Sequence, residues 1–528
     1  MKKEFNDTGH CVDNRHYMVD ITNKIEPIIA LIKNEKYFAI NRPRQFGKTT
    51  LLSCLARQMN RMDNYLALNI SFEAIESDAY IKQEYFINTF LDMLASEFHY
   101  LNHPTLSAFV EKNMDTIKRM SDLSKFITNL VRNMMPGKFL VLLIDEIDKS
   151  GNNQLFLDFL GMLRHKFLKR NEGRDFTFQS VILAGVHDIK NLKGKIRSDN
   201  DQKFNSPWNI AIDFTIDLSF DVNDIKTMLN SYARDKNISF DTTGIAEKIY
   251  YYTSGYPYLV SKLCKFIDEQ IAPQNGTRTW SIHDVDTAFN LIVSDGYSTT
   301  LFDSLTKYLE TNQKLYNLIS RISIDGAIFP FTITNPVINI GHLYGFLSAS
   351  HTGCCQIHNR IFEQRIYSHI MSNILQNVNH QISSFSEPEY YTNEGLDINL
   401  ILNRFQIFMK EHSAQKDEIF LEREGRLLFL SFLRPIINGR GFEFKEPNVS
   451  HERRMDIVIT YLNQRYVIEL KIWRGIKYHQ EGLKQLSDYL DIYSLKNGAL
   501  LIFNFNKNKE YKQENIVIDG KHVYIVWV

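Results

Sequence analysis

The stretch YFAINRPRQFGKTTLLSCLARQM, residues 37–59, decides the fold of the first part of the chain. Its first residues are apolar and predict a strand, and its last residues repeat apolar side chains at helical spacing. Between the two lies the run Gly47-Lys48-Thr49. A loop that joins a strand to a helix in this way can bind phosphate groups, because the backbone N–H groups at the helix N-terminus point at the anion. The stretch therefore predicts an α/β domain with a nucleotide site.

The residues of this loop have separate expected roles. Lys48 is expected to reach the β- and γ-phosphates, and the Thr49 hydroxyl is expected to ligate Mg²⁺. Arg42 stands where the commoner pattern G-x-x-x-x-G-K-[ST] has its first glycine, so the loop departs from that pattern at one position. A turn that binds no ligand is the alternative. The other positions expected to surround the nucleotide are Arg44, Gln45, Phe46, Gly47 and Thr50.

A second stretch, FLVLLIDEIDK at residues 139–149, supports this site. A uniformly apolar run is typical of a buried parallel strand, and α/β sheets bind ligands at the carboxyl ends of such strands. Asp145 is expected to hold Mg²⁺ through water, and Glu146 is expected to polarise the water that attacks the γ-phosphate. An acidic cap of the next helix would explain one carboxylate but not their combination with a G-K-T loop.

Over about residues 5–375 the chain resembles the P-loop ATPases of the AAA+/STAND assemblage, especially the prokaryotic AAA-like group with R-P-R-x-x-G-K-[ST] loops. The resemblance implies ATP binding and hydrolysis. It also implies that Pro257 lies near the base and couples its binding to the position of a helical lid. A proline at a helix start would explain Gly255-Tyr256-Pro257 without that role. The stretches that carry the resemblance are HYMVD (16–20), RPRQFGKTT (42–50), LLIDEID (142–148), VILAGVHDIKNLK (181–193) and SGYPYLVSKLC (254–264).

A third stretch, RMDIVITYLNQRYVIELKIWRG at residues 454–475, has the alternation of an antiparallel hairpin. If its turn centres on Asn463, Asp456 lies almost opposite Leu470. Glu469 and Lys471 are two residues apart and so share a strand face. Two carboxylates and a lysine at one end of a hairpin can bind Mg²⁺ through oxygen and orient a water. An exposed cross-strand ion pair is the alternative.

This pattern, D-x12-E-x-K across a hairpin, resembles the PD-(D/E)XK nuclease core over about residues 416–528. The resemblance implies that Asp456 and Glu469 ligate Mg²⁺ or Mn²⁺ and that these two and Lys471 are catalytic. A preceding helix offers Glu424 or Glu422 as a further metal ligand. Gln485 and Tyr489 match the Q-x-x-x-Y helix of many members.

The overall composition places few limits on the partner. Lys and Arg total 61, as do Asp and Glu, so nucleic-acid contact requires local basic patches. Five cysteines without a C-x-x-C pair indicate neither a disulfide framework nor a zinc site. No apolar run of about 18 residues occurs, so we expect a cytoplasmic protein without a membrane segment.

A chain of 528 residues should form several domains. We expect an α/β multidomain protein with a P-loop ATPase parallel sheet, a helical lid, a winged helix and a restriction-endonuclease-like α/β domain. The core strands are predicted at 36–41, 65–72, 139–144, 176–184 and 210–218. The expected boundaries are 1–220 for the ATPase core, 221–298 for the lid, 299–375 for the winged helix, 376–415 for a linker and 416–528 for the nuclease-like domain.

These expectations combine into one functional hypothesis. An ATP-binding and ATP-hydrolysing switch would control a metal-dependent nuclease that cleaves DNA, and the resemblance suggests defence against, or mobility of, foreign DNA. A homo-oligomer is expected. The alternatives are a STAND-like signalling ATPase whose last domain binds without cutting, and a remodeller that translocates with continuous ATP turnover.

Overall fold

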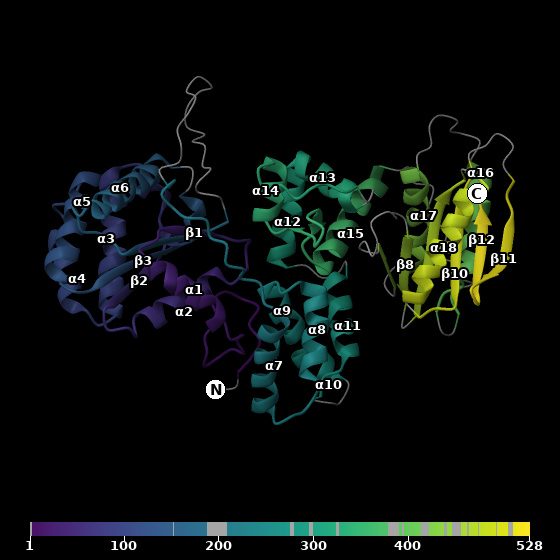
Figure 1. Ribbon diagram of the computed structural model, residues 1–528, viewed down its shortest axis with the longest axis horizontal. Coiled ribbons are helices and arrows are strands. Elements are labelled where there is room, and N and C mark those ends of the chain that lie inside the picture. The colour runs from purple at the N-terminus through teal and green to yellow at the C-terminus, as the bar shows by residue number, and fades with distance from the viewer. Residues whose placement is uncertain are drawn as a thin grey trace, which may run out of the picture.

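The computed structural model places three regions side by side (Figure 1): a sheet with its helices, a group of helices and a second sheet. Within its described residues, no helix is both long and apolar enough to span a membrane. The described residues are 3–150, 153–186, 208–274, 279–294, 299–323, 327–377, 390–392, 395–412, 422–437, 441–445, 456–461, 464–473, 475–492, 494–504 and 510–528.

The first sheet is parallel, as the sequence predicts. Its order is β1-β4-β3-β2. Alternate residues of the central strand face opposite layers: Val141 and Leu143 pack in one core cluster, and Leu142 and Ile144 in the other. Because both faces are covered, the strand is apolar throughout. The strands are β1 (Phe38–Asn41), β2 (Tyr65–Ser71), β3 (Phe139–Asp145) and β4 (Ser180–Gly185).

Helices form the two layers on this sheet. The first layer contains α1 (Thr22–Lys33) and α2 (Lys48–Met59). The second layer contains α3 (Gln83–Tyr100), α4 (Pro104–Met114), α5 (Met120–Asn129) and α6 (Gln154–Asn171). Short turns are η1 (Phe72–Ala74), η2 (Ser77–Tyr80), η3 (Leu130–Met134) and η4 (Ile147–Lys149).

The strand predicted at 210–218 is wrong. This segment makes one isolated bridge, Phe38 with Ile212, and is not a strand of the sheet. Its apolar side chains still pack on the core, and the ring of Phe214 stacks on that of Phe38 with centroids 5.6 Å apart. The carbonyl of Ile216 accepts a hydrogen bond from the Arg42 side chain, so it is bonded outside a strand ladder. The alternation of apolar and polar residues in 210–218 therefore reflects the burial of side chains and not the pairing of a strand.

The middle region is helical as far as Val293. Its helices are α7 (Val222–Lys236), α8 (Thr242–Thr253), α9 (Pro257–Phe266), α10 (Ala272–Gln274) and α11 (Ile282–Val293), with η6 (Ile267–Ile271) between α9 and α10. Three helices, an antiparallel hairpin and a long helix follow in the range predicted to be a winged helix, and that assignment stays a prediction. They are α12 (Thr300–Thr311), α13 (Gln313–Ser323), α14 (Pro336–Leu343), β5 (Leu347–Ala349), β6 (Cys355–Ile357) and α15 (Arg360–Asn377).

The C-terminal sheet is mixed, in the order β11-β12-β10-β9-β8-β7. One face packs on α18 through Leu486 and Leu490, and the other packs on α16 and α17 through residues such as Phe405 and Phe432. The elements are α16 (Ile398–His412), α17 (Glu422–Ile437), β7 (Gly441–Lys445), β8 (Asp456–Tyr461), β9 (Gln464–Ile472), α18 (Ile476–Ile492), β10 (Asn497–Phe503), β11 (Gln513–Ile518) and β12 (Lys521–Trp527).

The expected linker, 376–415, contains a helix that packs on this sheet. The amide of Gln406 in α16 donates to the carbonyl of Trp527 at 2.7 Å, and Tyr524 donates to Asn403. Ile401, Leu402 and Phe405 are fully buried. The second part of the range predicted as a linker therefore packs on the C-terminal sheet. We propose that the C-terminal domain begins near residue 390.

Candidate functional site

The phosphate loop ends in a tight turn before α2. Gln45 and Gly47 both have left-handed backbone angles, with φ of 56° and 77°. Gly47 is the N-cap of α2, where glycine adopts this conformation without strain. A Cβ placed on Gly47 would lie 3.9 Å from the Cβ of Pro257. Pro257, at the first position of α9, therefore lies beside the loop, and its role near the base stays a prediction.

Lys48 is buried at the start of α2. Its ammonium donates to the carbonyls of Arg42 at 3.0 Å and Pro43 at 2.9 Å. Burial lowers the pKa of the Lys48 ammonium, while the nearby carboxylates, led by Asp148 and Glu146, oppose that shift. The loop thus holds its lysine through its own backbone.

Thr49 and Asp145 meet as the sequence predicts. The Thr49 hydroxyl donates to a carboxylate oxygen of Asp145 at 2.6 Å, although 96 positions separate them. Asp145 is buried at the carboxyl end of β3. A hydroxyl and a carboxylate at this distance are the oxygen ligands that Mg²⁺ uses beside nucleotide phosphates. The pair therefore fits the expected metal.

Glu146 follows Asp145 in a left-handed conformation, with φ of 53°. A non-glycine residue in this region is strained, and such strain is common at functional sites. Its backbone N–H donates to the Asp145 carboxylate at 2.9 Å. Burial raises the pKa of the Glu146 carboxyl. The backbone turns sharply at Glu146, so the side chain of Glu146 does not continue in the direction of the Asp145 side chain.

Asp148 is a residue that the sequence analysis missed. Its two carboxylate oxygens accept from the Val186 N–H at 2.8 and 2.9 Å, so it joins the ends of β3 and β4. A Cβ on Gly185 would lie 2.9 Å from one of those oxygens, which explains the glycine there. The sequence did contain a signal for this residue, because Asp148 is the third acidic residue between positions 145 and 148.

The loop is also covered by later parts of the chain. The Tyr256 hydroxyl donates to the carbonyl of Arg44, and the Gln45 amide donates to the Thr300 hydroxyl at 3.2 Å. A Cβ on Gly345, which follows α14, would lie 2.9 Å from a side-chain carbon of Pro43. The helical region and the segment 299–375 therefore both contact the phosphate loop.

An aromatic cluster completes this cover. The ring of Phe46 lies edge-on to Tyr256, with centroids 4.9 Å apart, and to His358 at 6.2 Å. Tyr256 also contacts Phe362 at 5.1 Å. Burial lowers the pKa of His358 to about 4, so this imidazole is neutral at pH 7. The aromatic cluster that covers the loop is therefore uncharged at His358.

Arg42, the departure from the commoner loop, has a structural role that sequence reasoning missed. Its guanidinium donates to the carbonyls of Ile216 at 2.8 Å and Asn41 at 2.9 Å. It also lies over the ring of Phe214, 5.4 Å from the centroid. Arg42 thus ties the loop to the segment that leads into α7. Thr50 is engaged on another side, where its hydroxyl accepts from the Cys11 N–H at 3.1 Å.

The C-terminal hairpin corrects the predicted register by one residue. Asp456 pairs with Glu469 rather than Leu470, because the turn has two residues between Tyr461 and Gln464 instead of three. Residues directly opposite in an antiparallel pair lie on the same face of the sheet. The true register therefore puts Asp456 and Glu469 on one face, which serves a shared metal better than the predicted one.

Glu469 and Lys471 come together on that face. Glu469 is buried, and one of its carboxylate oxygens accepts from the Lys471 ammonium at 2.9 Å. Helix α18 covers the pair, since a Cβ on Gly482 would lie 3.1 Å from the Lys471 side chain. Gln485 is buried in the same helix, and its side-chain oxygen has no hydrogen-bond partner among the described residues. Tyr489 is also buried there.

Two predicted metal ligands of this site are placed only by their backbone. The side chains of Asp456 and Glu424 lie outside the described residues, as does that of Glu422. Glu424 belongs to the first turn of α17, on the sheet face opposite α18. Among described side chains, no group of three His, Cys, Asp or Glu could hold a metal ion. The buried Glu469 beside a lysine, opposite Asp456, fits an Mg²⁺ or Mn²⁺ site.

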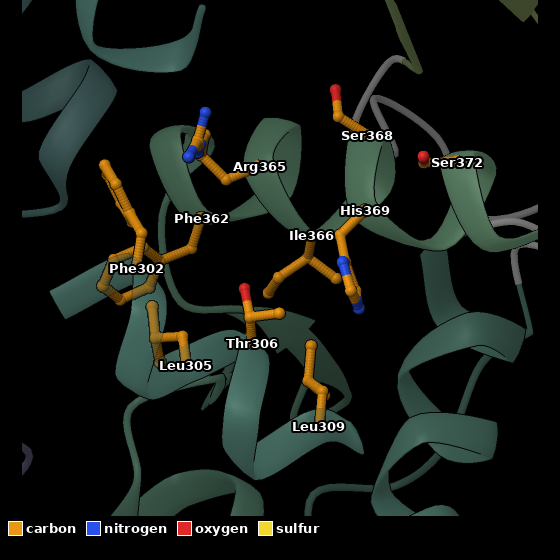
Figure 2. A pocket seen from close by; sticks show the side chains of 10 residues that line it. All are labelled: Phe302, Leu305, Thr306, Leu309, Phe362, Arg365, Ile366, Ser368, His369 and Ser372. Carbon is orange, nitrogen blue, oxygen red and sulfur yellow. The ribbon is translucent and has the colours of Figure 1, made fainter. Parts of the chain in front are cut away.

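A cavity of about 350 Å³ lies between α12 and α15, and Phe362 of the aromatic cluster over the phosphate loop is one of its lining residues. Figure 2 shows its lining, with apolar side chains from α12 facing a more polar face of α15. The Arg365 guanidinium donates to the carbonyl of Ser294 at 2.8 Å and lies over the ring of Phe302. None of the predicted site residues lines this cavity.

Comparisons with known proteins identify two domain families along the chain. A family model described as an AAA-like domain matches residues 12–280, just over half of the chain. A model of the PD-(D/E)XK nuclease superfamily matches residues 441–514. No protein with a curated description matches the sequence.

Several solved structures match about two thirds of the chain at low sequence identity. The Walker-type ATPase paby2304 of Pyrococcus abyssi is 10% identical, with a TM-score of 0.41, and the match covers 69% of this chain and 98% of that one. The ORC2 protein of Aeropyrum pernix is 12% identical, with a TM-score of 0.42, over 69% and 96%. The RuvB Holliday junction branch migration motor of Thermotoga maritima is 14% identical, with a TM-score of 0.32, over 66% and 94%.

Proposed function

The chain belongs to the AAA-like domain family, and we propose that it is an ATP-controlled nuclease whose C-terminal PD-(D/E)XK domain cleaves nucleic acid. DNA is the proposed substrate, and defence against or mobility of foreign DNA is the proposed role. The protein acts in the cytoplasm, as a homo-oligomer. The observation that carries the ATP part is the contact between Thr49 and Asp145 at 2.6 Å. The observation that carries the nuclease part is the Glu469–Lys471 pair opposite Asp456.

At the first site, the chain's own groups bind and orient the nucleotide. The N–H groups at the start of α2 and the Lys48 ammonium would bind the phosphates, and Pro257 would lie near the base. Thr49 and Asp145 would hold Mg²⁺, which would supply positive charge next to the phosphate oxygens. Glu146 accepts a hydrogen bond from the attacking water and so orients it. Its raised pKa places its proton exchange nearer to neutral pH than that of an ordinary glutamate.

At the second site, the strand pair aligns the reacting groups. Asp456 and Glu469 would hold Mg²⁺ or Mn²⁺, which supplies an activated water at the phosphodiester. The Lys471 ammonium, now paired with Glu469, lies where it can orient that water or stabilise charge on the phosphate. Burial of the Glu469 side chain strengthens these interactions, because water screens them less.

Control by nucleotide is supported by the cover over the phosphate loop. Four consecutive loop residues, 43–46, contact either the helical lid or the winged-helix segment. A nucleotide that moves the loop must therefore move those contacts. The winged-helix segment leads into the C-terminal domain, so its position can set whether the nuclease site is usable.

The winged helix itself is proposed as a connector rather than a DNA reader. Helix α14 occupies the position of a recognition helix, and its sequence, PVINIGHL, contains no lysine or arginine. DNA readers contact phosphates and base edges mainly with such residues. Nucleic acid is therefore expected at the C-terminal domain.

The test is a cleavage assay with purified full chain. Plasmid, single-stranded DNA and RNA are incubated with Mg²⁺ or Mn²⁺ under four conditions: no nucleotide, ADP, ATP and a slowly hydrolysed ATP analogue. Molecular mass is measured in parallel. We expect metal-dependent cleavage whose rate changes with nucleotide and is absent from Glu469→Ala. Binding of nucleic acid without any cleavage would favour the signalling ATPase instead, and equal rates in all four states would exclude gating.

A further inference from the structure

The strand that carries Glu469 and Lys471 continues with a tryptophan on the same face. Trp473 is two residues beyond Lys471, and its backbone N–H donates to the carbonyl of Phe503 at 2.8 Å, which keeps the chain extended at this point. Its indole packs with the core cluster on the α18 side of the sheet. Two residues of extended chain span about 7 Å. Trp473 thus lies about 7 Å along the chain from Lys471, the proposed catalytic lysine.

Trp473 belongs to an aromatic cluster with an ion pair at its side. Its ring centroid lies 4.6 Å from that of Trp527 and 6.0 Å from that of His479. The Lys512 ammonium lies 4.5 Å from the centroid of Trp527 and 2.7 Å from a carboxylate oxygen of Glu514. Trp473 is partly exposed, whereas Trp527 is only 4% exposed. The cluster therefore contains one partly exposed indole, that of Trp473, which packs on the buried indole of Trp527.

The cluster also contains two buried ring nitrogens. The Nδ1 of His479 and the Nε1 of Trp527 have no hydrogen-bond partner among the described residues, but the same holds for the Nε1 of Trp280 in the core of the helical region, so these atoms do not by themselves point to a ligand. The feature that fits nucleic acid is the partly exposed aromatic face of Trp473, because proteins stack unpaired nucleobases on such faces.

We propose that the Trp473 indole stacks on an unpaired base next to the cleaved phosphate. This inference rests on the proposed nuclease function and specifies its substrate. A base inside a continuous duplex is stacked on both sides and cannot offer a free face without being flipped out. The preferred substrate is therefore single-stranded, or duplex with an unpaired end, rather than intact duplex.

Binding is measured by fluorescence anisotropy with full chain that carries Lys471→Ala, so that the oligonucleotide is not cut. Labelled single-stranded DNA and the matching duplex are compared. Trp473→Leu keeps an apolar side chain but removes the aromatic face, and Trp473→Phe keeps an aromatic face. We expect single-stranded DNA to bind more tightly, Trp473→Leu to weaken it roughly 5- to 100-fold and Trp473→Phe to retain most of the affinity.

A matched control separates stacking from a general surface effect. Tyr251 is a partly exposed aromatic residue on α8, with the guanidinium of Arg360 4.0 Å from its ring centroid. Tyr251→Leu removes a similar aromatic and cationic pair outside the nuclease domain. It should leave single-strand affinity unchanged. Thermal unfolding of each variant checks that the fold is retained.

Abasic substitution gives the sharper result. Single abasic sites are moved along the strand, and one position should weaken binding about as much as Trp473→Leu does. That same position should have little further effect in the Trp473→Leu protein, because the two changes remove one interaction. Additive losses at every position overturn the proposal.

The remaining outcomes separate the two proposals. If the wild type cuts nucleic acid while folded Trp473→Leu binds and cuts like it, stacking is overturned and the nuclease function stands. Equal affinity for intact duplex and single strand also overturns stacking. If the chain neither binds nor cuts any nucleic acid, both proposals are wrong.

Discussion

The two candidate sites differ in how far along the chain their parts come from. The phosphate loop is joined to Cys11, Asp145, Ile216, Tyr256 and Thr300, which belong to five separate segments. The nuclease site is built from one hairpin and the helix that follows it. A site made of distant segments responds to domain position, whereas a site made of one hairpin responds mainly to local chemistry. This contrast suits a sensor joined to an effector.

The largest expected effect is at the local site. Glu469→Ala and Asp456→Ala should each reduce cleavage to background, because each removes an expected metal ligand, while nucleotide binding stays unchanged. Folding should be nearly intact in Asp456→Ala, since the change removes one of two negative charges from paired positions of the metal-free protein. Glu469→Ala also removes the ion pair with Lys471, so its thermal midpoint should fall further. Cleavage rate, nucleotide affinity and thermal midpoint are measured together. Cleavage that persists in both variants would place the metal elsewhere.

Lys48→Ala tests the distributed site. Nucleotide binding should be lost, because Lys48 is the cation expected to reach the β- and γ-phosphates. Calorimetric titration with ATP and ADP measures it. Nuclease chemistry should survive in Lys48→Ala but no longer respond to nucleotide. A variant whose cleavage still changes with ATP would break the contrast between sensor and effector.

Glu146→Gln should separate binding from turnover. The amide keeps the size of the side chain but cannot accept a proton, so ATP affinity should remain and hydrolysis should fall strongly. Phosphate release and ATP affinity are the two measurements. Equal loss of binding in Glu146→Gln and Lys48→Ala would contradict the separate roles given to these residues.

Arg42→Gly measures how much the contacts between Arg42 and the segment before α7 stabilise the fold. The change removes the hydrogen bond from the guanidinium to Ile216 and the contact with Phe214. We expect a loss of about 1.5–3 kcal/mol of unfolding free energy, typical for hydrogen bonds to charged groups. Nucleotide binding should persist at temperatures where the variant is folded. Arg42→Lys serves as control, and an unchanged denaturation midpoint in Arg42→Gly would refute the tie.

The smallest expected effect is on the pH profile of ATP turnover. Burial raises the pKa of Glu146, and only the deprotonated form accepts the proton of the water. Turnover should therefore fall as pH falls, with a midpoint above the usual value of about 4.3 for glutamate. The rate is followed from pH 8 to pH 5 with ATP at saturation. A rate that stays constant over this range would show that Glu146 keeps an ordinary pKa.

Both sites could be located from the sequence because their main residues are neighbours in the chain. Lys48 and Thr49 follow a strand directly, Asp145 and Glu146 end one, and Glu469 and Lys471 alternate on one. Periodicity places such residues on a helix end or a strand face without knowledge of the rest of the fold. The predicted register missed by one residue, because the length of a short turn depends on its backbone geometry rather than on side-chain pattern.

What the sequence by itself determined was therefore the chemistry: a phosphate loop, an acidic strand end and a D-x12-E-x-K hairpin. The tertiary structure alone decided the contacts between distant segments. Arg42 bonds the carbonyl of Ile216, Tyr256 bonds that of Arg44, and Trp473 packs on Trp527. Local propensity acts over a few residues, whereas these contacts form only when burial of the whole core brings separate segments together.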